Sequence, residues 1–211
     1  MERYETEEQQ VEAIKRFWKE NGMAMVIGAV LGLSGLYAWR WYNDNQKAAQ
    51  EQASVAYEQA EQQLLKDDGG FSQAQAYISA NNDSGYAQLM AFELAQQAIE
   101  RKDLSEAEKQ LSFVSGTADM MAVKAIAQLR LARVQLEQGK LDEALATAEL
   151  VTDEAFSGQT QEIKGDVYVA QSLFDKARAA YSAALEKNSN DSTLKMKMDN
   201  LANRSAAAAN S

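Results

Sequence analysis

The chain has 211 residues, of which 25% are charged, a formal net charge of −10, and no Cys, His or Pro. Without Cys or His it lacks disulfides, thiolate nucleophiles, the commonest general base and the usual ligands of transition metals, so no cofactor or metal ion is expected. An acidic surface repels phosphate backbones, so nucleic acid is not an expected partner. A Pro-free sequence rich in good helix formers predicts an all-α chain.

Residues 1–22 are predicted to form an amphipathic arm. The sequence from Thr6 to Gln9 has the form of a helix capping box. After it, apolar residues recur at helical spacing and form a stripe opposite charged residues. The stripe consists of Val11, Ile14, Phe17 and Trp18. Two interpretations stay open: the arm lies on the membrane surface, or it binds a partner in the cytoplasm.

The next stretch, residues 23–39, carries no charge and is followed by Arg40, Trp41 and Tyr42. As a helix it is about 26 Å long, close to the ~30 Å apolar core of a lipid bilayer. The aromatic flank favours the headgroup level, so residues 23–42 are predicted to be a transmembrane anchor. A buried core helix is disfavoured because the stretch has no polar face. A cleaved signal peptide is disfavoured because bulky residues end the apolar run.

Positive charge gathers on the N-terminal side of this anchor. Four Lys or Arg side chains precede it, whereas Arg40 and Lys47 are the ones close behind it. The positive-inside rule therefore predicts a cytoplasmic N-terminus and a C-terminal domain across the membrane.

Small residues share one face of the predicted anchor, at spacings of four, four and three. They are Ala24, Gly28, Gly32 and Gly35. The step from Gly28 to Gly32 is a GxxxG pattern, which lets a second transmembrane helix approach closely. Ordinary glycine usage in a membrane helix is the other explanation of the stripe.

The remainder, residues 43–201, is predicted to be one domain of paired helices, followed by a disordered tail at 202–211. The expected pairs are 54–65 with 72–80, 86–100 with 105–114, 122–138 with 141–151, and 162–172 with 175–186. A short capping helix is expected at 193–201. Each of the last three pairs has Leu or Phe three residues before an Ala at the start of its second helix, and these alanines are Ala107, Ala144 and Ala177.

Their spacings of 37 and 33 residues are close to the tetratricopeptide period. The first pair fits that pattern poorly. The sequence therefore predicts a tetratricopeptide repeat (TPR)-like α-solenoid of three to four hairpins with a C-terminal capping helix.

Stacked hairpins present a concave surface on their first helices. The expected groove is apolar in its middle, acidic toward its end, and suited to an extended or partly folded polypeptide. Its residues are Leu89, Phe92, Gln96, Ile99, Ile126, Leu129, Arg133, Leu136, Gln159, Glu162, Asp166 and Val169. Packing of the same apolar side chains on neighbouring helices or on a dimer mate is a strong alternative.

Catalysis has little support. No Gly-rich phosphate loop or nucleophile motif appears, and most carboxylates have the spacing of solvated helix faces. An envelope hydrolase using Glu162 and Asp166 is a third hypothesis, but the expectation is that the chain is not an enzyme.

Residues 4–22, followed at once by a single span ending in Trp39-Arg40-Trp41-Tyr42, resemble the start of the YfgM-type ancillary subunits of the SecYEG translocon. Residues 129–134 and 165–168 are similar to the repeat region of that family. The resemblance implies a single-pass bacterial inner-membrane protein with a periplasmic TPR-like domain. It implies SecYEG and the membrane-anchored chaperone PpiD as partners, and no catalytic residues.

The expected function is a membrane-anchored adaptor that helps pass translocated polypeptides to periplasmic chaperones. The alternative is a regulator of an envelope stress response that acts through the cytoplasmic arm.

Overall fold

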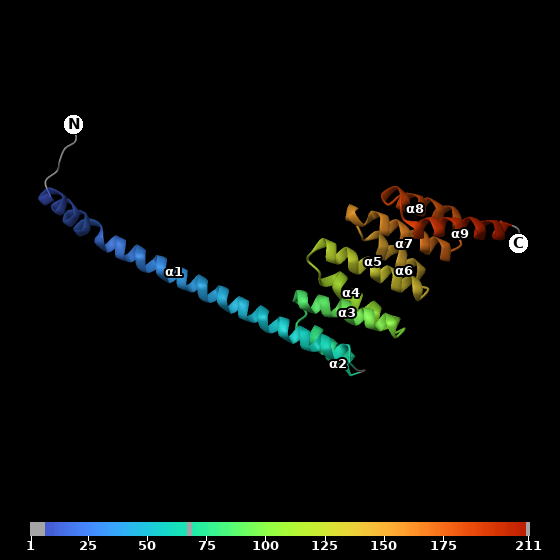
Figure 1. Ribbon diagram of the computed structural model, residues 1–211, viewed down its shortest axis with the longest axis horizontal. Coiled ribbons are helices and arrows are strands. Elements are labelled where there is room, and N and C mark those ends of the chain that lie inside the picture. The colour runs from blue at the N-terminus through green and yellow to red at the C-terminus, as the bar shows by residue number, and fades with distance from the viewer. Residues whose placement is uncertain (1–6, 67–68, 210–211) are drawn as a thin grey trace, which may run out of the picture. The chain divides into compact units, whose positions relative to one another are not determined.

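The computed structural model describes residues 7–66 and 69–209, and within those ranges it contains helices and no strand (Figure 1). The elements are α1 (Glu7–Leu64), α2 (Gly70–Ala80), α3 (Gly85–Glu100), α4 (Leu104–Thr117), α5 (Met121–Glu137), α6 (Leu141–Glu149), the short 3₁₀ helix η1 (Glu154–Phe156), α7 (Ser157–Ala170), α8 (Phe174–Lys187) and α9 (Ser192–Ala209). The predicted all-α class is confirmed. Thr6, which begins the predicted capping box, lies outside the described residues.

The chain divides into two units, Met1–Ala53 and Ser54–Ser211. In the first unit α1 carries the apolar stretch, and among the described residues it is the one helix long and apolar enough to cross a membrane. Its large side chains are exposed, for instance Leu31 at 67% and Leu33 at 68%. A helix buried in a protein core would have them covered. The predicted long apolar N-terminal helix is therefore confirmed.

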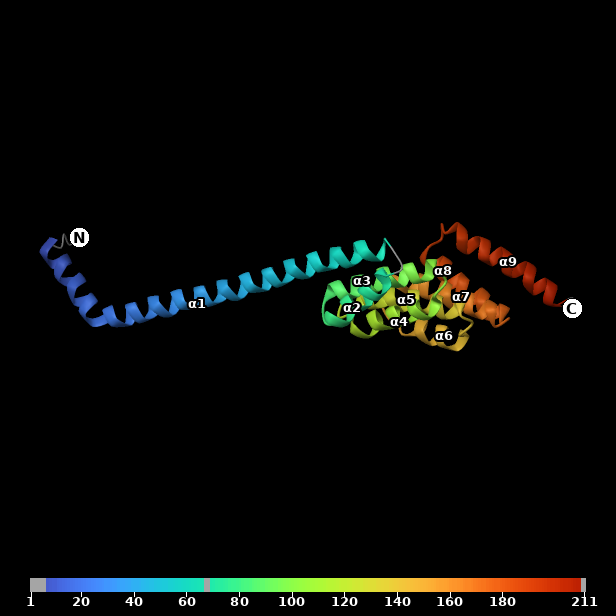
Figure 2. The same cartoon turned by 90° about the horizontal axis from the view of Figure 1, so that it is seen from below.

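The arm and the apolar stretch meet at Asn21 and Gly22, two residues of low helix propensity. The Asn21 side-chain amide donates a hydrogen bond to the Phe17 carbonyl oxygen, 3.2 Å away. Figure 2 shows α1 bending near its N-terminal end. Such a bend is expected where Gly and a side chain competing for the backbone interrupt a helix.

In the second unit, helices that follow one another in sequence pack as neighbours from α2 to α9 (Figure 1). The three hairpins α3–α4, α5–α6 and α7–α8 share one turn geometry. Lys102, Gly139 and Ser172 have positive φ angles of 63°, 76° and 61°, each five residues before a signature alanine. The next residue closes each turn by donating its N–H to a carbonyl five residues back, at 2.8–2.9 Å. The repeat register read from the alanines is thus present in the backbone.

The signature alanines explain why the hairpins close tightly. Ala107, Ala144 and Ala177 are fully buried where second helices pack on first helices. Gly165 does the same in the last hairpin, because a Cβ there would collide with the Tyr181 ring. Small side chains let the backbones approach, and larger neighbours fill the remaining space.

The first pair, formed by the end of α1 and by α2, packs differently. Tyr57 lies edge-on to Tyr77 with ring centroids 6.4 Å apart, and Tyr86 of α3 lies 5.7 Å from Tyr57. Burial, together with the nearby Glu61 carboxylate, raises the pKa of Tyr57 to about 12. Small residues also let these two helices approach, because Ala74 is fully buried and a Cβ at Gly70 would collide with the backbone of Gln63 and Leu64.

The largest differences from the predicted helix ends are in α7 and α9. Helix α7 begins at Ser157, ahead of the expected residue 162, because η1 leads directly into it. Helix α9 continues past Leu201 to Ala209. Its last four residues are alanines, the best helix formers, so nothing in the local sequence stops it. Of the predicted tail, residues 210–211 lie outside the described residues.

Candidate protein-binding surface

The predicted groove residues lie on α3, α5 and α7, and most of them reach the surface. Leu89 and Ile99 on α3 are 50% and 43% exposed, and Arg133 on α5 is also exposed. The others that are at least partly exposed are Phe92, Gln96, Ile126, Leu136, Gln159, Glu162, Asp166 and Val169. The exposed apolar side chains among them, Leu89 and Ile99, are both on α3, whereas Phe92 and Val169 also pack against core clusters.

Leu129 does not line the groove, so that prediction is wrong. Its side chain is only 2% exposed and belongs to a core cluster with Ala132, Ala148 and Ile163. The physical reason is the position of α5 inside the stack, where it packs against α4, α6 and α7 together. Helix α7 therefore covers a face of α5 that the sequence pattern alone leaves open.

A hollow of about 630 Å³ lies between the C-terminal halves of α3 and α5. Its lining residues are Ile99, Lys102, Leu104, Arg130, Arg133, Val134 and Glu137. Ile99 and Arg133, two of the predicted groove residues, thus line the same hollow. Its volume is within the range of pockets that hold a ligand or a few side chains of a partner.

Three cations and one carboxylate surround this hollow, in a chain with a net charge of −10. The Arg130 guanidinium lies over the Phe92 ring, 5.0 Å from its centroid. Sequence reasoning missed Lys102 and Arg130, because one lies in a turn and the other beside the expected inward positions. The turn position of Lys102, equivalent to Gly139 in the next hairpin, was the available signal.

The acidic end of the groove is closed by the capping helix. Nζ of Lys197 on α9 lies 2.7 Å from Oε1 of Glu162 and 2.7 Å from Oδ2 of Asp166. The Tyr181 hydroxyl donates to the other Asp166 oxygen at 2.7 Å. Burial alone lowers the pKa of Lys197, but the hydrogen bonds to both carboxylates outweigh it and leave the pKa raised. The two carboxylates predicted for the acidic end of the groove therefore share one ammonium group, which neutralises only one of their two negative charges.

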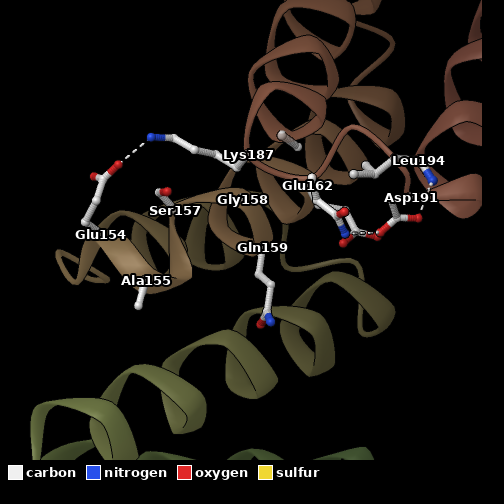
Figure 3. Close-up of a pocket in the computed structure, with 11 residues that line it drawn as sticks. Glu154, Ala155, Ser157, Gly158, Gln159, Glu162, Lys187, Asp191 and Leu194 are labelled. Carbon is white, nitrogen blue, oxygen red and sulfur yellow. Dashed lines mark hydrogen bonds and ion pairs between the residues drawn. The ribbon is translucent and has the colours of Figure 1, made fainter.

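A second hollow, of about 320 Å³, lies where the N-terminal end of α7 meets the end of α8 and the start of α9 (Figure 3). Figure 3 shows Glu154 and Lys187 facing each other across an ion pair. Asp191 accepts hydrogen bonds from the N–H groups of Thr193 and Leu194 at the start of α9. The charged groups around this hollow cap α9 and form contacts within the hairpin, so their role is structural.

The small-residue stripe of α1 has open space around it in the first unit. A Cβ added at Gly28, Gly32 or Gly35 would meet no atom within 4 Å. The stripe, which includes Ala24, is thus accessible to another helix. A helix contact through it stays a prediction.

Catalytic chemistry gains no support from the described residues. Among them, no group of three or more acidic residues is placed to hold a metal ion. Glu162 and Asp166, the pair named for the hydrolase hypothesis, both bind Lys197. Carboxylates held by one ammonium group across two helices are typical of a structural contact.

Comparison with known proteins agrees with this geometry. The stacked hairpins define a TPR-like repeat protein with an apolar N-terminal helix, and the family model described as a tetratricopeptide repeat-like domain matches residues 15–203. Curated relatives named "Ancillary SecYEG translocon subunit" include one from Escherichia coli K12, 34% identical over 95% of this chain and 99% of its own length. Another is from Haemophilus influenzae, 30% identical over 92% of this chain and 97% of its own length.

The chain belongs to this family of ancillary SecYEG translocon subunits, as the opening motif and the repeats predicted. Among solved structures, the TPR domain of P58(IPK) is similar to 72% of this chain and 46% of that chain, with a TM-score of 0.48 and 16% sequence identity.

Proposed function

We propose that this chain is a non-enzymatic, membrane-anchored adaptor of the Sec translocon. Its TPR-like domain binds proteins and helps pass translocated polypeptides to periplasmic chaperones, PpiD among them. The observation that carries the proposal is the combination, in one chain, of an exposed apolar helix and a repeat domain with exposed apolar groove residues. The names of the relatives supply the translocon as the partner.

The mechanism is passive. A domain tethered to the membrane meets a neighbouring partner at a high effective concentration, so weak contacts in the groove are sufficient for capture and release. No bond is made or broken. Binding energy comes from apolar side chains such as Ile99 and Leu89, each of which removes apolar surface from water when covered.

The domain plan follows from the charges around the anchor. Residues 1–22 lie in the cytoplasm, 23–42 span the inner membrane, 43–201 form the periplasmic domain, and 202–211 form the tail. Within the arm, Phe17 and Trp18 are 56% and 57% exposed, which fits insertion at the headgroup level. The bend of α1 in Figure 2 fits an arm that turns along the membrane surface.

Site-specific photocrosslinking in intact membranes tests the proposal. Probes at Ile99 and Arg133 report on the groove, a probe at Gly32 reports on the anchor, and a probe at Arg178, exposed on α8, is the off-groove control. Groove probes are expected to crosslink to translocating chains or a periplasmic chaperone, and Gly32 to a translocon helix. Equal crosslinking from Ile99 and Arg178 would refute a binding role for the groove.

A second candidate function rests on the arm itself, whose apolar side chains are exposed in the structure. In that role residues 1–22 bind a cytoplasmic stress-response factor. Deleting the arm while keeping the anchor separates the two functions. The adaptor proposal expects translocon crosslinks and client transfer to survive the deletion. Their loss would favour the cytoplasmic role.

A further inference from the structure

We propose that the hollow between α3 and α5 is a docking site for polypeptide segments in which apolar side chains are flanked by Asp or Glu. This inference rests on the proposed binding function of the groove and specifies its ligand. Ile99, Leu104 and Val134 provide the apolar part of the lining, and Lys102, Arg130 and Arg133 provide the positive charge.

The cations are available for a ligand. Neither the Lys102 ammonium group nor the Arg133 guanidinium makes a hydrogen bond or ion pair with any residue that the structure describes, and both side chains are exposed. Glu137 also lines the hollow, one helical turn from Arg133, but forms no ion pair with it. An incoming carboxylate therefore displaces no internal partner.

The hollow at α7 to α9 has the opposite character. There Glu154 binds Lys187, Asp191 caps α9, and Glu162 binds Lys197. A ligand would have to break these contacts, whereas the Lys102 and Arg133 side chains at the hollow between α3 and α5 have no ion-pair partner among the described residues. Because the whole chain has a net charge of −10, an acidic segment is repelled by most of the surface and attracted here.

The position of Arg130 sets the geometry of the site. Its guanidinium lies over the Phe92 ring, which holds a flat donor group beside the apolar lining. A guanidinium held in this way keeps its N–H groups available for a carboxylate in the same plane. Apolar contact and charge contact are thus adjacent, which favours a ligand that carries both.

Peptide binding to the full chain in nanodiscs of neutral phosphatidylcholine tests the inference. The probe is a short fluorescent peptide, blocked at both ends, with leucines flanked by glutamates, and its partner peptide has glutamines in place of the glutamates. Fluorescence anisotropy should show tighter binding of the acidic peptide, with an affinity that falls as salt is added.

The charge variant is Lys102→Asn with Arg133→Gln. Asn tolerates the positive φ of residue 102, so the turn is retained. Two partly exposed ion pairs contribute about 1 kcal/mol together, so the acidic peptide should bind about fivefold more weakly and the glutamine peptide unchanged. The matched control, Arg178→Gln with Lys195→Gln, removes the same charge from exposed positions on α8 and α9 and should leave both affinities unchanged.

Ile99→Ser tests the apolar half and should weaken both peptides about tenfold without changing the salt dependence. Equal binding of the two peptides, no binding of either, or an equal effect of the control pair would overturn the inference. So would binding that needs a free terminal carboxylate. Competition by anionic lipid, or by a second copy at higher protein concentration, would assign the hollow to those occupants instead and also overturn it.

The two proposals fail separately. Translocon crosslinks that persist without acidic selectivity would overturn this inference alone. Acidic selectivity without translocon crosslinks would overturn the proposed adaptor function alone.

Discussion

Substitution of Lys197 tests directly how the capping helix α9 is held on the domain. Its side chain is 27% exposed, and those of Glu162 and Asp166 are 20% and 25% exposed. Lys197→Met leaves the methylene packing nearly intact but deprives two carboxylates of their counter-ion. An exposed pair contributes about 0.2–1 kcal/mol, and breaking a buried one costs about 3–5 kcal/mol. Because the exposure of these side chains lies between the two cases, Lys197→Met is expected to lower the free energy of unfolding by about 2 kcal/mol.

Hydrogen exchange of the full chain in nanodiscs measures this loss locally. Amides of α9 from Leu194 to Leu201 exchange when the helix undocks, so a loss of about 2 kcal/mol should raise their exchange rates about 30-fold. Lys195→Met, on the same helix but exposed, is the matched control and should change little. Equal exchange in the two variants would refute the view that Lys197 holds α9 in place.

Removing all three charges at once distinguishes pairing from simple packing. Lys197→Met with Glu162→Gln and Asp166→Asn leaves no unpaired carboxylate, and the Tyr181 hydroxyl still has an oxygen acceptor. Stability should recover most of the loss, because an unpaired buried charge is worse than none. A triple variant as unstable as Lys197→Met would show that the lost charges are not the cause.

Three further substitutions, and the pH dependence of Lys197→Met, are expected to have defined effects. Gly165→Ala should lower the free energy of unfolding by about 1–3 kcal/mol, because the added Cβ collides with the Tyr181 ring. The melting temperature followed by circular dichroism should fall by about 5 °C. Gly116→Ala, in open space on α4, is the control and should be neutral or stabilising. The hydrogen bond from Lys140, which outweighs burial, lowers the pKa of Glu108 below its ordinary 4.5. The contribution of ionised Glu108 to stability is therefore present above pH 4.5 and is lost as the pH falls through the folded pKa. Glu108→Gln should therefore be less stable than the parent at pH 7 and equal to it in acid, as followed by urea unfolding. The raised pKa of Lys197 has the opposite pH dependence. The contribution of charged Lys197 to stability is full below pH 10.5 and is lost as the pH rises through the folded pKa. Lys197→Met should therefore be as stable as the parent in strong alkali.

The groove shows where sequence reasoning stopped. Periodicity placed Leu129 and Ile99 at corresponding kinds of position on consecutive first helices, yet one is buried and the other is 43% exposed. The difference depends on which neighbour covers each helix, and α7 covers α5 at Leu129. Glu162 and Asp166 are a similar case, because their partner Lys197 is 31 or more residues away in sequence.

The sequence by itself determined the features that depend on local pattern: the uncharged apolar helix, the all-α class, the positions of the hairpins, and the register carried by Ala107, Ala144 and Ala177. These follow from side-chain periodicity and from the space available at a helix crossing, both of which are readable within a few turns. Only the tertiary structure decided which side chains remain at the surface. The clustering of Lys102, Arg130 and Arg133 around Ile99, and the closure of the acidic end by α9, arise from the packing of helices that are distant in sequence.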